Sequence, residues 1–185
     1  MGRLVRIALV AVVGLVAVAC GISTFDQPQG QVSVSPDGAF TASEMTRSEA
    51  ESLLAKQVTQ LSPVLFPAYL TEGATTCTAS GARDTFNVQC SGGAIIVELA
   101  TQTENPQEYK PMVLRRVVFR SDPAAMFMDV DPAHLDAVRM MLWSESGNSP
   151  DRACGCVQYE LHIMGISQAE FFKIANSLHV AKQHG

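Results

Sequence analysis

The stretch VQYELHIMGISQAEFFKIANSL, residues 157–178, contains a strand pattern followed directly by a helix pattern. Apolar and polar residues alternate over its first seven positions, which is typical of an antiparallel strand with one buried face and one solvated face. The apolar positions are Val157, Tyr159, Leu161 and Ile163. Ser167-Gln168-Ala169-Glu170 then has the spacing of a capping box, and apolar residues follow it at helical intervals, at Phe171, Ile174, Ala175 and Leu178. We therefore expect this helix to pack against the apolar face of the strand.

A second helix pattern lies near the beginning of the chain. Thr46 and Glu49 have capping-box spacing, and a stripe of apolar residues runs from Ala50 to Leu61. Between the two helix patterns the apolar period is mostly two, over 75–80, 86–90, 94–100, 113–120, 126–130 and 138–145. Because the helices lie at the ends and the strands between them, the order indicates an α+β fold. We expect a curved antiparallel sheet of about six strands, flanked by an N-terminal and a C-terminal helix.

Two cysteines fit one of the expected hairpins. If Ala82–Thr85 forms a four-residue loop, Cys77 lies directly opposite Cys90. Opposite residues of an antiparallel pair have Cα atoms about 4.5 Å apart where they are not hydrogen-bonded, and a disulfide can bridge that distance. Turn and cysteine spacing therefore predict a Cys77–Cys90 bridge.

The first twenty residues have the pattern of a secretory signal peptide. Arg3 and Arg6 precede Ile7–Ala19, a run of 13 small and apolar residues, which is shorter than the roughly 20 that a membrane-spanning helix needs. The run ends in Ala17-Val18-Ala19-Cys20-Gly21, which resembles the bacterial lipoprotein box. That resemblance implies cleavage before Cys20, acylation of its thiol, and a lipid anchor on the extracytoplasmic side of the cell membrane or outer membrane. The alternative is an ordinary signal peptide or short anchor with a chance cysteine.

Charge limits the kinds of partner, and composition indicates where the domain begins and ends. Cleavage would leave 11 basic and 18 acidic residues without a Lys/Arg cluster, which argues against a nucleic-acid partner and leaves the acyl chains as the means of membrane attachment. Residues 20–43 are rich in Gly, Pro, Ser, Gln and Asp, so we expect the lipidated cysteine and a flexible tether there. Residues 1–19 are then the signal peptide, 44–181 a single α+β domain, and 182–185 a frayed tail.

Motifs at both ends of the expected domain resemble a known group. FPAYLTEG at 66–73 has Thr71 where the group has proline, and the closing motif runs from Trp143-Ser144-Glu145 through Tyr159 and Gly165-Ile166-Ser167 to Ile174-Ala175-Asn176-Ser177-Leu178. They resemble small extracytoplasmic domains of membrane-anchored anti-sigma factors and of sporulation-linked lipoproteins. That group is similar in shape to lipoprotein carriers of the LolA type and to the sigma-regulatory protein RseB, whose curved half-barrel can hold an acyl chain. The resemblance implies a binding or regulatory domain without catalytic residues.

Cys154 and Cys156 leave several possibilities open. In an exported chain they favour disulfides, either with each other or one each with Cys77 and Cys90. A bridge across one residue is strained, and strained bridges suit thiol–disulfide chemistry. No helix begins directly after the pair to lower a thiol pKa, so we expect a structural role, with redox chemistry or metal binding as alternatives.

A soft-metal site is a further candidate. Met126 and Met128, and likewise His162 and Met164, are two residues apart, so each pair shares one face of an expected strand. Thioethers and imidazole are ligands suited to Cu(I). The simpler interpretation is that the methionines fill the core and that His162 is solvated, so no metal is assigned.

The sequence contains no Gly-x-Ser-x-Gly, His-Glu-x-x-His or phosphate-loop motif. We therefore predict no enzymatic activity and no cofactor. The leading hypothesis is a lipid-anchored extracytoplasmic domain that binds an envelope protein partner or an apolar ligand. The alternative is a thiol-redox or copper-handling lipoprotein of the periplasm or cell surface.

Overall fold

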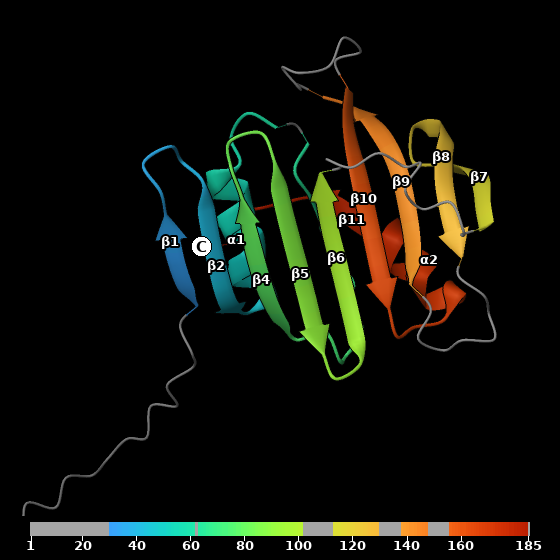
Figure 1. The fold of residues 1–185 in the computed structure, drawn as a ribbon, viewed down its shortest axis with the longest axis horizontal. Helices are drawn as coiled ribbons and strands as arrows, with labels where there is room; N and C mark the ends of the chain where they lie inside the picture. The colour runs from blue at the N-terminus through green and yellow to red at the C-terminus, as the bar shows by residue number, and fades with distance from the viewer. Residues whose placement is uncertain (1–29, 62, 102–112, 130–137, 148–155, 185) are drawn as a thin grey trace, which may run out of the picture.

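The computed structural model describes residues 30–61, 63–101, 113–129, 138–147 and 156–184 (Figure 1). Within these residues, two helices and eleven strands follow one another. Their bounds are β1 Gln31–Val34, β2 Phe40–Met45, α1 Arg47–Gln57, β3 Leu65–Pro67, β4 Thr76–Gly81, β5 Phe86–Gly92, β6 Ile95–Thr101, β7 Val113–Phe119, β8 Asp122–Asp129, β9 Arg139–Ser146, β10 Cys156–Met164, α2 Gln168–Asn176 and β11 Leu178–Val180.

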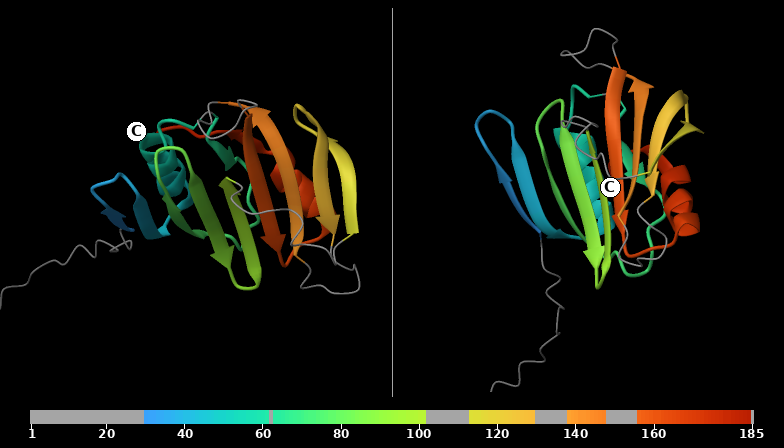
Figure 2. Two further views of the ribbon diagram at one scale, coloured as in Figure 1. Left: turned by 45° about the horizontal axis from the view of Figure 1, so that its top comes forward. Right: turned by 45° about the vertical axis from the view of Figure 1, so that its right-hand side comes forward.

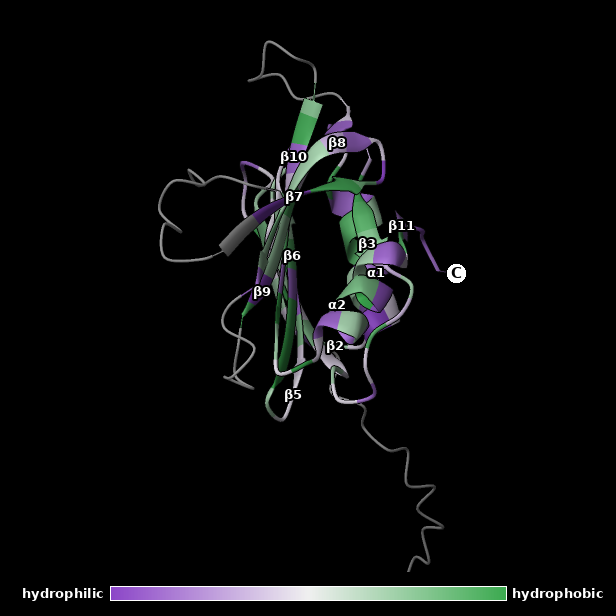
Figure 3. Cartoon of the chain, turned by 90° about the vertical axis from the view of Figure 1, so that its right-hand side faces the viewer, coloured by the Kyte–Doolittle hydropathy of each residue, from purple (hydrophilic) through white to green (hydrophobic). Residues whose placement is uncertain are grey.

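Nine strands form one open antiparallel sheet, in the order β1-β2-β4-β5-β6-β10-β9-β8-β7. Both helices and the small β3–β11 pair lie on the same side of this sheet, as the edge-on view shows (Figure 3). The expected α+β class is confirmed, whereas the expected count of about six strands is wrong.

Two of the additional strands lie where the sequence predicted a tether. The tether expected over residues 20–43 is wrong for β1 and for the first residues of β2, which pair with each other. The cause is a short alternation, in which Phe40 and Ala42 are buried while Thr41 and Ser43 are exposed. Small polar residues around these two apolar positions hid the period of two.

Strand β10 lies in the interior of the sheet, next to the central strand β6, although it is the last long strand in the sequence. It pairs with β6 on one side and with β9 on the other, so β7, β8 and β9 fold out beyond it. Its alternation matches the prediction, because Val157, Tyr159, Leu161 and Ile163 are all at most 3% exposed. These side chains face the helices and form the middle of the core.

Aromatic rings fill the layer between α2 and the sheet. Phe171 of α2 is fully buried, and its ring centroid lies 5.3 Å from that of Phe127. Phe172 lies against the same Phe127 ring at 4.9 Å. Further along the sheet Trp143 stacks on Tyr159 at 5.3 Å, and the Tyr159 hydroxyl donates to the carbonyl of Pro63. Burial, with Glu145 nearby, raises the pKa of Tyr159. The hydroxyl is therefore held in its neutral, hydrogen-bonding form.

The C-terminal segment is docked along its described length. The expected helix ends at Asn176, and β11 pairs with β3. The predicted fraying of residues 182–185 is wrong for Lys182 and His184, because their backbone N–H groups donate to Glu51 and Ser52 of α1. These long-range contacts could not be read from local sequence.

Candidate functional site

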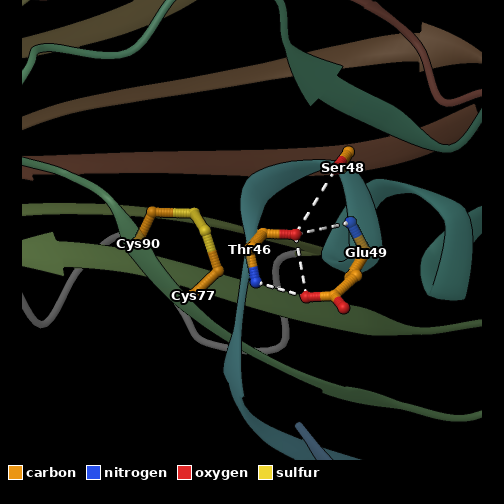
Figure 4. The surroundings of a disulfide bond; sticks show 5 residues. All are labelled: Thr46, Ser48, Glu49, Cys77 and Cys90. Carbon is orange, nitrogen blue, oxygen red and sulfur yellow. Dashed lines mark hydrogen bonds between the residues drawn. A yellow bond between two sulfur atoms is a disulfide. The ribbon is translucent and has the colours of Figure 1, made fainter. Parts of the chain in front are cut away.

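A disulfide joins β4 to β5, beside the beginning of α1 (Figure 4). Cys77 pairs with Cys90 in the hairpin register, with Cα atoms 4.0 Å apart, and both residues are buried. Next to it, Thr46 and Glu49 form the predicted capping box at the beginning of α1. The predicted Cys77–Cys90 bridge is confirmed. The alternative in which these two cysteines bond to Cys154 and Cys156 is wrong.

Of the other three cysteines, only Cys156 lies within the described residues. Cys156 begins β10 and is disulfide-bonded. The predicted lipidation site Cys20 and the predicted bridge partner Cys154 lie outside the described residues.

The four soft-metal candidates share one face of the sheet, the face without helices. Register places Met128 opposite Met140 on β9, and Met140 opposite His162 on β10. Met126 and Met164 lie two residues from Met128 and His162, so alternation puts them on the same face. The sequence predicted each pair separately. Strand order brings the pairs together and adds Met140 on the strand between them.

These outward-facing methionines form a cluster of their own. Met128, Met140 and Leu142 are 0%, 1% and 3% exposed, and Met126 packs against them. They lie apart from the main core that the helices cover. At the edge of the cluster, His162 contacts the carboxylate of Glu160, and the His162 side chain is 24% exposed.

A cluster of polar side chains joins the C-terminal segment to α1. The sequence analysis did not predict it. The side chain of Glu51 is only 4% exposed. Its Oε1 contacts Nε2 of His179 at 2.8 Å and accepts from the Lys182 N–H at 3.0 Å, while its Oε2 contacts Nε2 of His184 at 2.7 Å. We call Glu51, His179 and His184 the carboxylate clasp.

Burial alone would make ionisation of Glu51 costly. The hydrogen bonds from His184, His179 and Lys182 outweigh that cost, so the pKa of Glu51 is lower than usual. The clasp thus holds an ionised carboxylate between the helix and the tail. The histidines fall in the last seven residues and Glu51 lies 128 positions before His179, so no local motif could have predicted the contact.

A shallow groove runs along α1 next to the clasp. It has a volume of about 440 Å³ and is lined by Met45, Ser48, Glu49, Ser52, Leu53, Lys56 and His184. On the same side of the sheet, α1 packs on β2, β4 and β5. The edge strand β1 extends past this cover, as Figure 2 shows. Val32 and Val34 are opposite the buried Ala42 and Phe40, so they face the helix side, yet they remain 47% and 52% exposed.

In comparisons with known proteins, no family model matches the chain, and no curated protein or solved structure is detectably similar to it. Among the described residues, no helix is both long and apolar enough to cross a membrane. The same residues contain no group of three or more His, Cys, Asp or Glu side chains that could hold a metal ion. The hydrogen bonds of Glu51 make the carboxylate clasp a link between α1 and the C-terminal segment.

Proposed function

We propose that this chain is a lipid-anchored extracytoplasmic binding domain without enzymatic activity, and that it binds a partner protein through the β1 edge. The anchor would be Cys20 with its acyl chains, on the cell membrane or outer membrane. The observation that carries the proposal is the difference between the two edges of the sheet.

The β1 edge lacks the usual protection against strand pairing. Edge strands commonly carry charged residues or proline, which discourage another chain from adding to the sheet. The opposite edge, β7, has exposed Arg115 and Arg116. Strand β1 reads Gln-Val-Ser-Val, with all four residues exposed and none charged. An added strand would form backbone hydrogen bonds there and cover Val32 and Val34, which is the β-augmentation mode of peptide recognition.

The chemistry of the partner follows from this geometry. A segment that adds to β1 would be extended, and apolar side chains at alternate positions would continue the inner face past Val32 and Val34. The groove along α1 lies on the β1–β2 side, since Met45 at the end of β2 lines it. It offers Leu53 for apolar contact and Glu49, Lys56 and His184 for polar contact.

An apolar ligand between the sheet and α2 is less well supported. The space that a half-barrel carrier would use holds Phe127, Phe171, Trp143 and Tyr159, all at most 2% exposed. The redox alternative needs a reactive thiol pair at Cys154 and Cys156. Because Cys156 is disulfide-bonded, a structural bridge accounts for it more simply.

Site-specific photo-crosslinking in intact cells tests the proposal. A photoreactive residue at Ser33 on β1 is expected to give one discrete adduct with another protein. The same residue at Val118, which is 80% exposed on the opposite edge, is the control and is expected to give none. The double substitution Val32→Lys/Val34→Lys should abolish the Ser33 adduct, whereas Val118→Lys should leave it intact.

Three results would overturn the proposal. One is the absence of an adduct at Ser33, and another is an adduct that survives the double lysine substitution. The third is an adduct with the mass of two copies of this chain, which would indicate self-association. Circular dichroism of the lysine variants shows whether they remain folded, which we expect because both valines are half-exposed.

A further inference from the structure

We propose that the helix-free face of β8, β9 and β10 contains a binding site for a soft monovalent cation, Cu(I), with Met128, Met140 and His162 as ligands. The site lies on the opposite face of the sheet from the surface proposed for protein binding and is independent of it.

Register places the three ligands side by side. Met128 of β8 is opposite Met140 of β9, and Met140 is opposite His162 of β10, so the three form one row across three adjacent strands. Directly opposite side chains of antiparallel strands have Cβ atoms about 4.5–5.5 Å apart. Met140 is thus the middle ligand, and Met128 and His162 reach toward it from either side. Methionine has three rotatable side-chain bonds, which lets both sulfurs turn toward one ion.

The ligand chemistry selects a soft ion. Thioether and imidazole groups favour Cu(I), whereas carboxylate-rich sites favour harder cations. In the described part of the chain no group of three or more His, Cys, Asp or Glu could hold a metal ion. A site on this face would therefore have to depend on sulfur from methionine.

His162 is held in a manner that suits a metal ligand. Its Nε2 contacts the carboxylate of Glu160, and metal-binding histidines commonly have one ring nitrogen held by a carboxylate. The negative charge of Glu160 next to the site would also balance a monovalent cation.

The burial pattern allows a dry site with an entrance. Met128 and Met140 are 0% and 1% exposed, so their sulfurs lie away from water. The side chain of His162 is 24% exposed, and Met126 is partly buried. An ion would therefore enter beside His162, on the β10 side of the row.

The test uses the full-length lipoprotein in detergent, with its disulfides oxidised and its methionine methyl groups labelled with ¹³C. Ag(I), a redox-inert mimic of Cu(I), is titrated while the methyl signals are followed by NMR. We expect one equivalent of Ag(I) to shift the signals of Met128 and Met140. Met141 is the internal control, because it lies between Met140 and Leu142 on the same strand but faces the main core. Its signal should not move.

Variants then identify the ligands. Met128→Leu, Met140→Leu and His162→Gln should each weaken Ag(I) and ascorbate-maintained Cu(I) binding about ten-fold or more, as loss of metal-site residues does. Met141→Leu is the matched control and should bind as the parent does. Leucine for methionine nearly conserves volume, so the fold should survive in all three leucine variants.

Several results would overturn the inference. One is an Ag(I)-induced shift of the Met141 signal as large as that of Met140, and another is a Met128→Leu/Met140→Leu double variant that binds as tightly as the parent. Loss of binding on Cys154→Ser/Cys156→Ser substitution with no change in the methyl signals would place the ion on cysteine sulfur. In each case the methionine cluster would be apolar packing alone.

Discussion

Glu51 is an acid on a mostly polar helix, yet its carboxylate is buried because two imidazoles and a backbone N–H surround it. The pKa of Glu51 determines how the link between α1 and the C-terminal segment depends on pH. A carboxyl group whose folded-state pKa is lowered contributes stability above its unfolded pKa and loses that contribution as the pH falls through the folded value. For Glu51 the contribution is complete above the ordinary value of 4.5 and declines below it.

We therefore predict that Glu51→Gln lowers the free energy of unfolding near neutral pH by about 2 kcal/mol, the usual scale for hydrogen bonds to a charged group. The difference between the parent and this variant should shrink as the pH is lowered below 4.5. Urea unfolding of both proteins at a series of pH values measures this difference in the free energy of unfolding. Glu44→Gln is the control, because Glu44 is exposed, and it should leave stability unchanged at every pH. A difference for Glu51→Gln that does not depend on pH would contradict the ionised clasp.

At the scale of elements, the sequence predicted the strands whose pattern lies within a short stretch of chain, and it missed those that depend on distant residues. The β4–β5 hairpin was predicted with its register because the turn length and the two cysteines gave the same pairing, and Cys77 is indeed opposite Cys90. Strand β10 was predicted because its alternation is long and regular. Strands β3 and β11 have three residues each and are stabilised by pairing across more than 110 positions of sequence, so no local pattern marked them.

In the candidate metal site, too, the local part of the arrangement was predicted and the long-range part was not. Alternation alone predicted that Met126 and Met128 share a face, and that His162 and Met164 share a face. The strand order β10-β9-β8 then put Met140 between them, which the sequence could not reveal because the order of strands is set by long-range packing. The carboxylate clasp was missed for the same reason.

Helix α2 carries the next prediction, because Phe171 lies fully buried between the helix and the sheet. If α2 seals a solid core, Phe171→Ala should lower the free energy of unfolding by about 3–5 kcal/mol, the usual range for a buried aromatic residue. Phe172→Ala is the neighbouring control and should lower it less, because Phe172 is partly exposed. Denaturant unfolding of both variants provides the comparison.

The same two variants test for a carrier-like pocket. With a packed core, neither the parent protein nor Phe171→Ala should bind a fluorescent fatty-acyl probe. A small stability loss together with probe binding by the parent would instead show that Phe171 lines an apolar pocket, as in a lipid carrier.

At the scale of the whole molecule, the described domain and the predicted anchor are separate units along the chain. The sheet begins at Gln31, so only ten residues, 21–30, separate it from Cys20. The proposed tether is therefore shorter than the sequence alone suggested. If Cys20 is acylated and β1 binds a partner, as proposed, these ten residues are all the chain that lies between the anchor and the binding edge.

The last prediction concerns this anchor. Cys20→Ala should leave the precursor without acyl chains, because acylation needs the thiol, and the chain should no longer fractionate with the membrane as a lipoprotein. Its thermal unfolding should match that of the parent, since the core residues lie at Phe40 and beyond. Labelling with a radioactive fatty acid, membrane fractionation and a thermal melt measure the three effects. Cys77→Ala/Cys90→Ala is the matched cysteine control: it should keep the fatty-acid label and lose stability, because it removes the bridge between β4 and β5. A Cys20→Ala protein that still carries the label would show that the acyl chains are attached elsewhere.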